Sequence, residues 1–168
     1  MKVKLDVNKW AITENLEVWL LTEGLLNCIG LIIYNQNNQK LGLIHIGGQQ
    51  TLLNGPQLDN FKNYLQGVGQ NITHAIMIFT NEIPNEYLKQ RVKGLVNERT
   101  INQNSLYEFE GTGVRCKLEQ PPVLEQPNSD PDFNYNLYNQ SLQGFFTNDV
   151  HYLNQLQDPN FLLSHGEL

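Results

Sequence analysis

Short apolar runs separated by turn residues fill the first fifty positions, a pattern typical of β-strands joined by tight turns. One run covers 17–22 and ends at Gly24, and a second covers 28–34. Four polar residues follow at 35–38 (Asn-Gln-Asn-Asn), and 39–46 is apolar again. Because asparagine tolerates a left-handed backbone and its side chain can cap its own turn, this pattern favours a β-hairpin with 35–38 as its loop.

Helical spacing replaces this pattern after residue 54. Pro56 opens the first predicted helix, at a position where its missing N–H has no intrahelical partner to lose. Apolar residues then recur every three or four positions, at Leu58, Phe61, Leu65 and Val68. The run 72–80 predicts a strand. Pro84 opens a second predicted helix, which carries Tyr87, Leu88, Val92, Leu95 and Val96.

Strand-like runs return at 106–109 and 114–118, and the glycine-containing segment 110–113 between them predicts a second hairpin. The order of strands, helix, strand, helix and strands favours an α+β fold, a β-sheet sandwich packed with two helices. Prolines cluster soon afterwards. We therefore divide the chain into one folded domain at 1–119 and a Pro-rich linker with an Asn-, Gln- and aromatic-rich tail at 120–168.

Composition narrows the classes of function. The 168 residues suit a single domain, and 40% of them are hydrophobic, enough to form a core. The formal net charge of −6, with no Lys- or Arg-rich block, argues against a nucleic-acid partner. The longest apolar stretch, 29–34, is too short to span a bilayer, so we expect no membrane insertion. The N-terminus also has no apolar run typical of a signal peptide.

The two cysteines, Cys28 and Cys116, are too few for a disulfide framework, which favours a reducing compartment. Cys116 lies in a strand-like run with no turn before it, and we interpret it as structural. No Cys-x-x-Cys or His-x-x-x-His spacing occurs, and the segment 67–69 lacks the remaining features of a dinucleotide-binding loop. We therefore predict neither a metal nor a cofactor.

Cys28 and His45 fall on the two strands of the first hairpin. If 35–38 forms the loop, Tyr34 pairs with Gln39, and counting outward pairs Cys28 with His45. Directly opposed residues have Cβ atoms roughly 4.5–5.5 Å apart, near enough for a thiol and an imidazole to meet. A register slip of one residue would place the two side chains on opposite faces.

A paired thiol and imidazole suit attack on a carboxamide. An isolated thiol has a pKa near ~8.5, and a neighbouring imidazolium favours the thiolate. The histidine can protonate the departing amine and then activate water against the thioester. Backbone N–H groups in the turn before the cysteine, at Gly24 and Asn27, are the candidate oxyanion donors. A buried structural cysteine beside a structural histidine is the alternative interpretation.

The segment from Leu21 to Tyr34 (Leu-Thr-Glu-Gly-Leu-Leu-Asn-Cys-Ile-Gly-Leu-Ile-Ile-Tyr), followed by 41–46 (Leu-Gly-Leu-Ile-His-Ile), resembles the chemoreceptor glutamine deamidase family CheD. The same order of Thr, Cys and His occurs in the cytotoxic necrotising factor toxins, which are also glutamine deamidases. The resemblance implies that Cys28 is the nucleophile, His45 the base and Thr22 a third member that orients them. It also implies a CheD/CNF-like fold and a protein substrate that presents a glutamine side chain.

Several features depart from that family. Leu26-Asn27 replaces the Gly-Ser that precedes the cysteine there, Gly47-Gly48 stands in place of an apolar run ending in proline, and 120–168 has no counterpart. These departures favour a divergent deamidase, such as a bacterial effector or toxin secreted into a host cell without a classical signal peptide. The alternative is a chemoreceptor deamidase of the bacterial cytoplasm.

Three other functions remain compatible with the residues. A transglutaminase-type acyltransferase shares the thioester step and differs only in using an amine instead of water. A non-catalytic protein-binding module would use the sheet as a scaffold and the tail to recognise its partner. A papain-like protease fits less well, because those enzymes place the nucleophile at a helix N-terminus, whereas Cys28 precedes a predicted strand.

Overall fold

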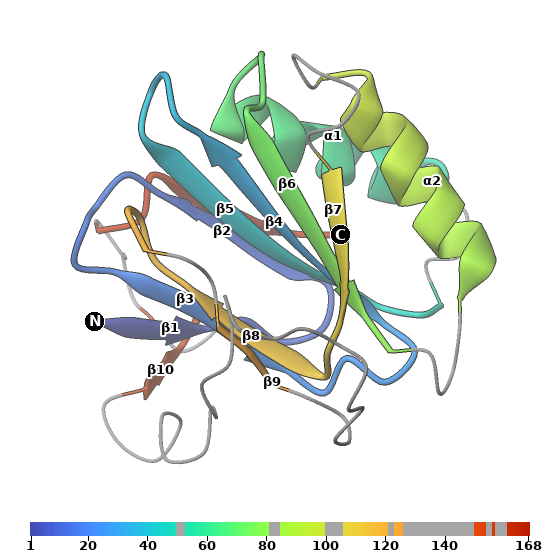
Figure 1. The fold of residues 1–168 in the computed structure, drawn as a ribbon, viewed down its shortest axis with the longest axis horizontal. Coiled ribbons are helices and arrows are strands. Elements are labelled where there is room, and N and C mark those ends of the chain that lie inside the picture. Colours follow the sequence, from blue (N-terminus) through green and yellow to red (C-terminus); the bar gives the residue numbers. More distant parts are fainter. Residues whose placement is uncertain are drawn as a thin grey trace.

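The computed structural model describes residues 1–49, 53–80, 85–99, 106–120, 123–125, 150–153, 156 and 161–168. Within these residues the chain forms two β-sheets and two α-helices, which confirms the α+β class (Figure 1). The six-stranded sheet has the order β11 (Ser164–Glu167), β2 (Lys9–Thr13), β5 (Lys40–Ile46), β4 (Ile29–Asn35), β6 (His74–Phe79) and β7 (Leu106–Glu110). The five-stranded sheet has the order β10 (Val150–Tyr152), β1 (Lys2–Lys4), β3 (Trp19–Glu23), β8 (Gly113–Cys116) and β9 (Val123–Glu125).

Two helices cover the outer face of the six-stranded sheet (Figure 1). Helix α1 (Pro56–Val68) begins at the proline predicted to open it. Helix α2 (Glu86–Asn97) begins after Asn85, whose side chain accepts a hydrogen bond from the backbone N–H of Leu88 at 3.3 Å. Asparagine is among the best N-cap residues because it satisfies one of the unpaired amides of the first turn. Pro84, the predicted start of this helix, lies outside the described residues.

Alternation along β4 divides the interior into two cores. Its odd-numbered residues pack with the helices, and the cluster includes Ile29, Leu31, Ile33, Phe61, Leu65, Leu88 and Val92. Its even-numbered residues face the five-stranded sheet, in a cluster that includes Cys28, Ile32, Leu43, Leu20 and Val114. Successive strand side chains point to opposite faces, so a residue's parity decides which core it enters. The even-numbered face of β4 is the one that bears Cys28.

The predicted register of the first hairpin is wrong by two residues. Asn35 is the last paired residue of β4 and opposes Lys40, so the loop is 36–39. The Asn35 side chain donates to the Val68 and Gln70 carbonyls and also accepts from the Asn37 N–H, which holds Asn35 in the strand. As a result His45 opposes Gly30, and Cys28 is not directly across from it.

The second predicted hairpin does not form, because its two runs belong to different sheets. Strand β7 pairs parallel with β6, whereas β8 pairs antiparallel with β3. The connection between them crosses from one sheet to the other. It is anchored on both sides, since Gly111 N–H donates to the Phe79 carbonyl and the Thr112 carbonyl accepts from Leu25 N–H.

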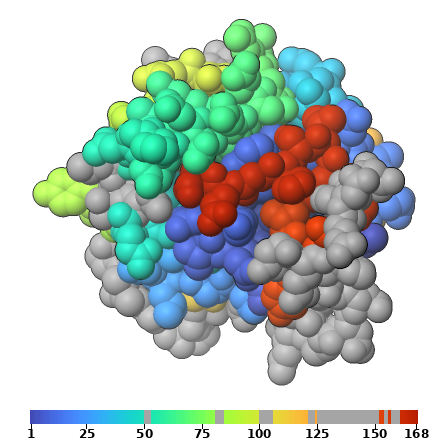
Figure 2. All heavy atoms as spheres, turned by 180° about the vertical axis from the view of Figure 1, so that it is seen from behind, coloured from blue at the N-terminus to red at the C-terminus, as the bar shows by residue number. Residues whose placement is uncertain are grey.

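The described parts of 120–168 contribute strands to both sheets. Strand β9 pairs antiparallel with β8, β10 pairs parallel with β1, and β11 pairs antiparallel with β2. Figure 2 shows the red C-terminal residues lying across the blue N-terminal strands, beside the helical layer. These three strands of the segment 120–168 are therefore part of the two sheets of the sandwich.

Candidate functional site

Thr22, Cys28 and His45 all face the space between the two sheets. Thr22 lies on β3 of the five-stranded sheet, His45 on β5 of the six-stranded sheet, and Cys28 directly precedes β4. Thr22 and His45 are fully buried, whereas the Cys28 residue is 9% exposed. Cys28 is therefore the most exposed of the three residues.

A hydrogen bond joins Thr22 and His45 across the two sheets. Thr22 Oγ1 lies 2.8 Å from His45 Nδ1 and 2.7 Å from the Leu5 carbonyl oxygen. A carbonyl can only accept, so the single hydroxyl proton of Thr22 is donated to Leu5. Thr22 Oγ1 must then accept from His45, which places the ring proton on Nδ1.

The other ring nitrogen is consequently a bare acceptor. Among the described residues His45 Nε2 has no hydrogen-bond partner, although it is buried. Most buried side-chain polar atoms in folded proteins are hydrogen-bonded, so an unpaired one needs an explanation. A general base supplies one, because Nε2 carries the lone pair that would take a proton from a nucleophile.

Cys28 shares the face of His45, but among the described residues no hydrogen bond joins its thiol to the imidazole. A register shift of two residues preserves parity, so both side chains still point between the sheets. Diagonal neighbours of this kind have separations of about 7–8 Å, somewhat less between Cβ atoms. The Cys28 thiol instead donates to Asn27 Oδ1 at 3.6 Å. A rotation about the Cys28 side-chain bond is needed to bring the thiol to the imidazole.

Both groups of the pair are neutral at neutral pH. Burial lowers the pKa of His45 to about 4, and burial also raises the pKa of Cys28. The Gly48 and Asn27 backbone N–H groups act in the opposite direction and lower the pKa of the Cys28 thiol. The imidazolium–thiolate pair expected from the sequence is therefore not the resting state. His45 is already a free base, and the thiol keeps its proton.

The two predicted oxyanion residues occupy different parts of the turn before Cys28. The Asn27 N–H favours the thiolate of Cys28, because it lowers the pKa of the thiol. Gly24 adopts a left-handed conformation with φ of 73°, and its carbonyl accepts from the Leu26 N–H at 2.9 Å. The N–H of Gly48, a further donor that was not predicted from the sequence, also lowers the pKa of the thiol. The glycine pair Gly47-Gly48 directly after the histidine strand was the signal for it.

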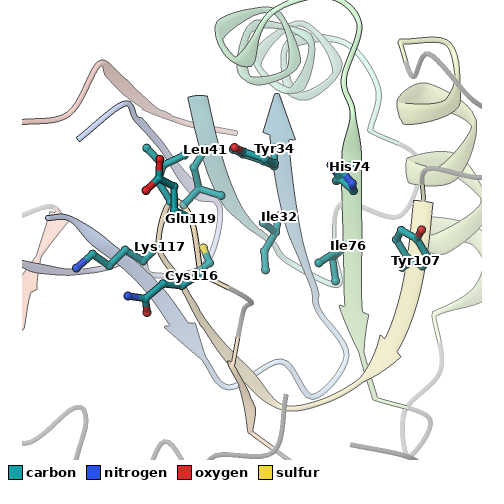
Figure 3. A pocket seen from close by; sticks show the side chains of 11 residues that line it. Ile32, Tyr34, Leu41, His74, Ile76, Tyr107, Cys116, Lys117 and Glu119 are labelled. Carbon is teal, nitrogen blue, oxygen red and sulfur yellow. The ribbon is translucent and has the colours of Figure 1, made fainter. Parts of the chain in front are cut away.

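A pocket of about 360 Å³ opens at the other end of the inter-sheet space, next to the hairpin loop. Figure 3 shows side chains from both sheets around it, with Ile32, Ile76 and Cys116 among them. Burial raises the pKa of Cys116, so this thiol stays protonated. The pocket walls contain none of the trio described above.

No protein-family model matches the chain, and no curated protein matches it. None of the helices in the described residues is long and apolar enough to cross a membrane. Within the same residues, no group of three or more His, Cys, Asp or Glu side chains is placed to hold a metal ion. The geometry of Thr22, Cys28 and His45 is therefore the basis on which a function can be proposed.

The buried neutral imidazole makes stability depend on pH. The folded pKa of His45, about 4, lies below its ordinary value of 6.5, so the unfolded chain binds more protons between these two values. The free energy of unfolding therefore rises with pH through this window, and we expect up to about 3 kcal/mol of it to be lost as the pH falls from 6.5 to 4. Urea unfolding across this range should show a much shallower dependence in His45→Asn. An equal slope in both proteins would contradict the burial of a neutral His45.

Proposed function

We propose that this protein is a cysteine-dependent protein-glutamine deamidase, in which Cys28 is the nucleophile, His45 the base and Thr22 the residue that orients the base. The hydrogen bond from His45 to Thr22 carries the proposal, because it leaves an unpartnered Nε2 on the face that also bears Cys28. The order of these residues matches the CheD and cytotoxic necrotising factor families, whose α+β fold we propose for this chain as well.

The proposed reaction begins when the thiol of Cys28 turns from Asn27 to His45. The thiol proton passes to Nε2 as sulfur bonds to the carbonyl carbon of the glutamine side chain, whose oxygen becomes an oxyanion. Collapse breaks the C–N bond, and the imidazolium gives its proton to the departing ammonia. Neutral His45 then takes a proton from water, which attacks the thioester. The C–S bond breaks, sulfur recovers its proton, and the product is glutamate.

The neutral resting pair supports a proton-transfer role for His45. A histidine with a pKa of about 4 is unprotonated at neutral pH, so it accepts the thiol proton only when the thiol attacks. A pKa this low makes neutral His45 a weak base. It also makes the imidazolium that forms a strong acid, which readily protonates the leaving nitrogen.

The surroundings of Cys28 favour a protein substrate over free glutamine. Leu26, two residues before the nucleophile, is 51% exposed, and Val7, which packs beside Gly47, is 46% exposed. Apolar side chains that remain in water near a reactive group are a feature of protein-contact surfaces. We propose that they contact the polypeptide on which the glutamine is carried, either a host protein reached by a secreted effector or a bacterial receptor.

A non-catalytic binding module is the competing function, and the unpaired Nε2 is what disfavours it. A histidine retained only for structure would be expected to use both ring nitrogens. Here Nδ1 is hydrogen-bonded to Thr22, whereas Nε2 has no hydrogen-bond donor among the described residues.

Incubation with unfolded casein, a glutamine-bearing protein, tests the activity directly. We expect ammonia release and a mass gain of one dalton for each glutamine converted. Added methylamine distinguishes the two fates of the thioester, because a transglutaminase attaches the amine to the glutamine whereas a deamidase continues to give glutamate. Neither ammonia nor an amine conjugate, from casein or from a panel of folded proteins, would contradict the proposal.

A further inference from the structure

Two consecutive glycines, Gly47 and Gly48, lie against the segment that carries Cys28. A Cβ atom at Gly48 would come within 2.6 Å of Asn27 Nδ2 and 2.7 Å of the Asn27 carbonyl oxygen. A Cβ atom at Gly47 would come within 2.8 Å of Asn8 Oδ1. A side chain at either position would displace its neighbours, so the glycine pair allows this loop to approach the nucleophile closely.

Hydrogen bonds from distant parts of the chain fix the Gly47–Gly48 peptide at both ends. Asn8 Oδ1 accepts from the Gly47 N–H at 2.8 Å, and Asn85 Nδ2 donates to the Gly48 carbonyl at 3.2 Å. The backbone N–H of Asn8 also donates to the carbonyl of His45 at 2.7 Å, which ties the loop to the strand of the base. The backbone on both sides of the Gly47–Gly48 peptide is therefore anchored.

Gly48 lies directly against Asn27, and the backbone N–H groups of both residues lower the pKa of the Cys28 thiol and so favour its thiolate. A donor that faces the sulfur also lies close to the oxygen of a carbonyl group that the sulfur attacks. Oxyanion sites commonly use two such donors, because the charge that develops on that oxygen is stabilised most by dipoles already in place.

We propose that the Gly48 N–H and the Asn27 N–H together hold negative charge at Cys28, first on the thiolate and then on the oxyanion. Asn8 and Asn85 are positioning residues that aim the Gly48 N–H. The oxyanion part of this inference rests on the proposed deamidase function, whereas the thiolate part can be measured without any substrate.

Replacement of Asn85 separates positioning from folding. Asn85→Ser keeps a side-chain oxygen that can cap α2 but loses the Nδ2 donor to Gly48. In a Cys116→Ala background, which leaves a single thiol, we expect alkylation of Cys28 by iodoacetamide at pH 8 to slow by ~3- to 10-fold, with the midpoint of its pH profile moved upward. We expect the deamidation kcat to fall ~10- to 100-fold, with KM and the urea unfolding midpoint little changed.

Asn85→Asp is the matched control, because it also caps the helix and loses the donor but adds a negative charge. Both variants should slow alkylation if the lost hydrogen bond is the cause. Slowing in Asn85→Asp alone would assign the effect to charge and overturn the inference, as would wild-type alkylation in both.

Asn8→Gly offers an independent approach from the other side of the same peptide. It keeps the left-handed backbone of Asn8, whose φ is 63°, but removes the acceptor for the Gly47 N–H. We expect a loss of Cys28 reactivity similar to that in Asn85→Ser, and an unchanged alkylation rate would contradict the role of Asn8.

The two readouts distinguish this inference from the proposed function. Alkylation that depends on Asn85 in a protein that releases no ammonia would support the Gly48 donor and contradict the deamidase. Deamidation that continues at the full wild-type rate in Asn85→Ser would support the enzyme and overturn the Gly48 donor.

Discussion

Replacing Cys28 with alanine is expected to reduce ammonia release from casein to the uncatalysed background, a loss on the order of 10³-fold or more. The reason is that no thioester can form without the sulfur. The other thiol of the chain cannot substitute for it, because Cys116 is fully buried at a different place in the fold and its pKa is raised. Ammonia release measured with a coupled enzyme assay is sufficient to test this expectation.

Cys116→Ala is the matched control for that experiment. Both substitutions remove a thiol from the core between the two sheets, so they impose similar losses of packing. We expect Cys116→Ala to keep wild-type activity at temperatures where it remains folded. Activity that survives Cys28→Ala, or that is lost equally in both variants, would show that Cys28 is not the nucleophile.

Replacing His45 with glutamine is expected to lower kcat by about 10²- to 10⁴-fold, the usual contribution of a positioned general acid–base. Glutamine can still hydrogen-bond to Thr22, but it cannot take up the thiol proton and pass it to the leaving nitrogen. The deamidation rate at several pH values is the measurement. In the wild-type protein we expect the rate to decrease as the pH falls towards about 4, where His45 becomes protonated.

His74→Gln serves as the control, since His74 is exposed at the other end of the sandwich and lines the pocket of Figure 3. It should leave kcat and its pH dependence unchanged. If His45→Gln has wild-type kcat, the unpartnered Nε2 has no part in the reaction. The proposal that His45 is the catalytic base is then wrong.

Much of the fold follows from the spacing of apolar residues. The helix that begins at Pro56 and the strands β3, β4 and β5 around Cys28 reflect periodicity within a short window of sequence. Thr22 was singled out through the family resemblance, and its hydrogen bond to His45 joins residues of two different sheets. The strands and the helix can be predicted from local sequence because each depends on residues that lie close together in the chain.

Other features depend on contacts that are distant in sequence. The hairpin register was wrong because Asn35 is held in its strand by carbonyls at the end of α1, which the hairpin sequence does not contain. The run 106–110 paired with β6 instead of forming a hairpin, since the chain crosses between sheets there. The neutral state of His45 follows from its burial, and the degree of burial cannot be predicted from the spacing of residues in the sequence. The Gly48 donor depends on Asn85, thirty-seven residues further along the chain.

The observed register of the first hairpin has a chemical consequence. Direct opposition would have kept the thiol and the imidazole in permanent contact, whereas diagonal placement on one face leaves the thiol bonded to Asn27 Oδ1 at rest. The Cys28 thiol is thus held by an acceptor other than His45. A resting cysteine of this kind is protected from adventitious alkylation and oxidation, which depend on the thiolate.

Thr22 fixes the His45 ring with its proton on Nδ1 and leaves Nε2 as an unprotonated acceptor between the sheets. Long-range proton–nitrogen NMR correlations of the His45 ring at neutral pH measure this directly. The structure predicts a neutral ring protonated on Nδ1 that titrates near pH 4. A ring protonated on Nε2, or one that is already an imidazolium at neutral pH, would contradict it.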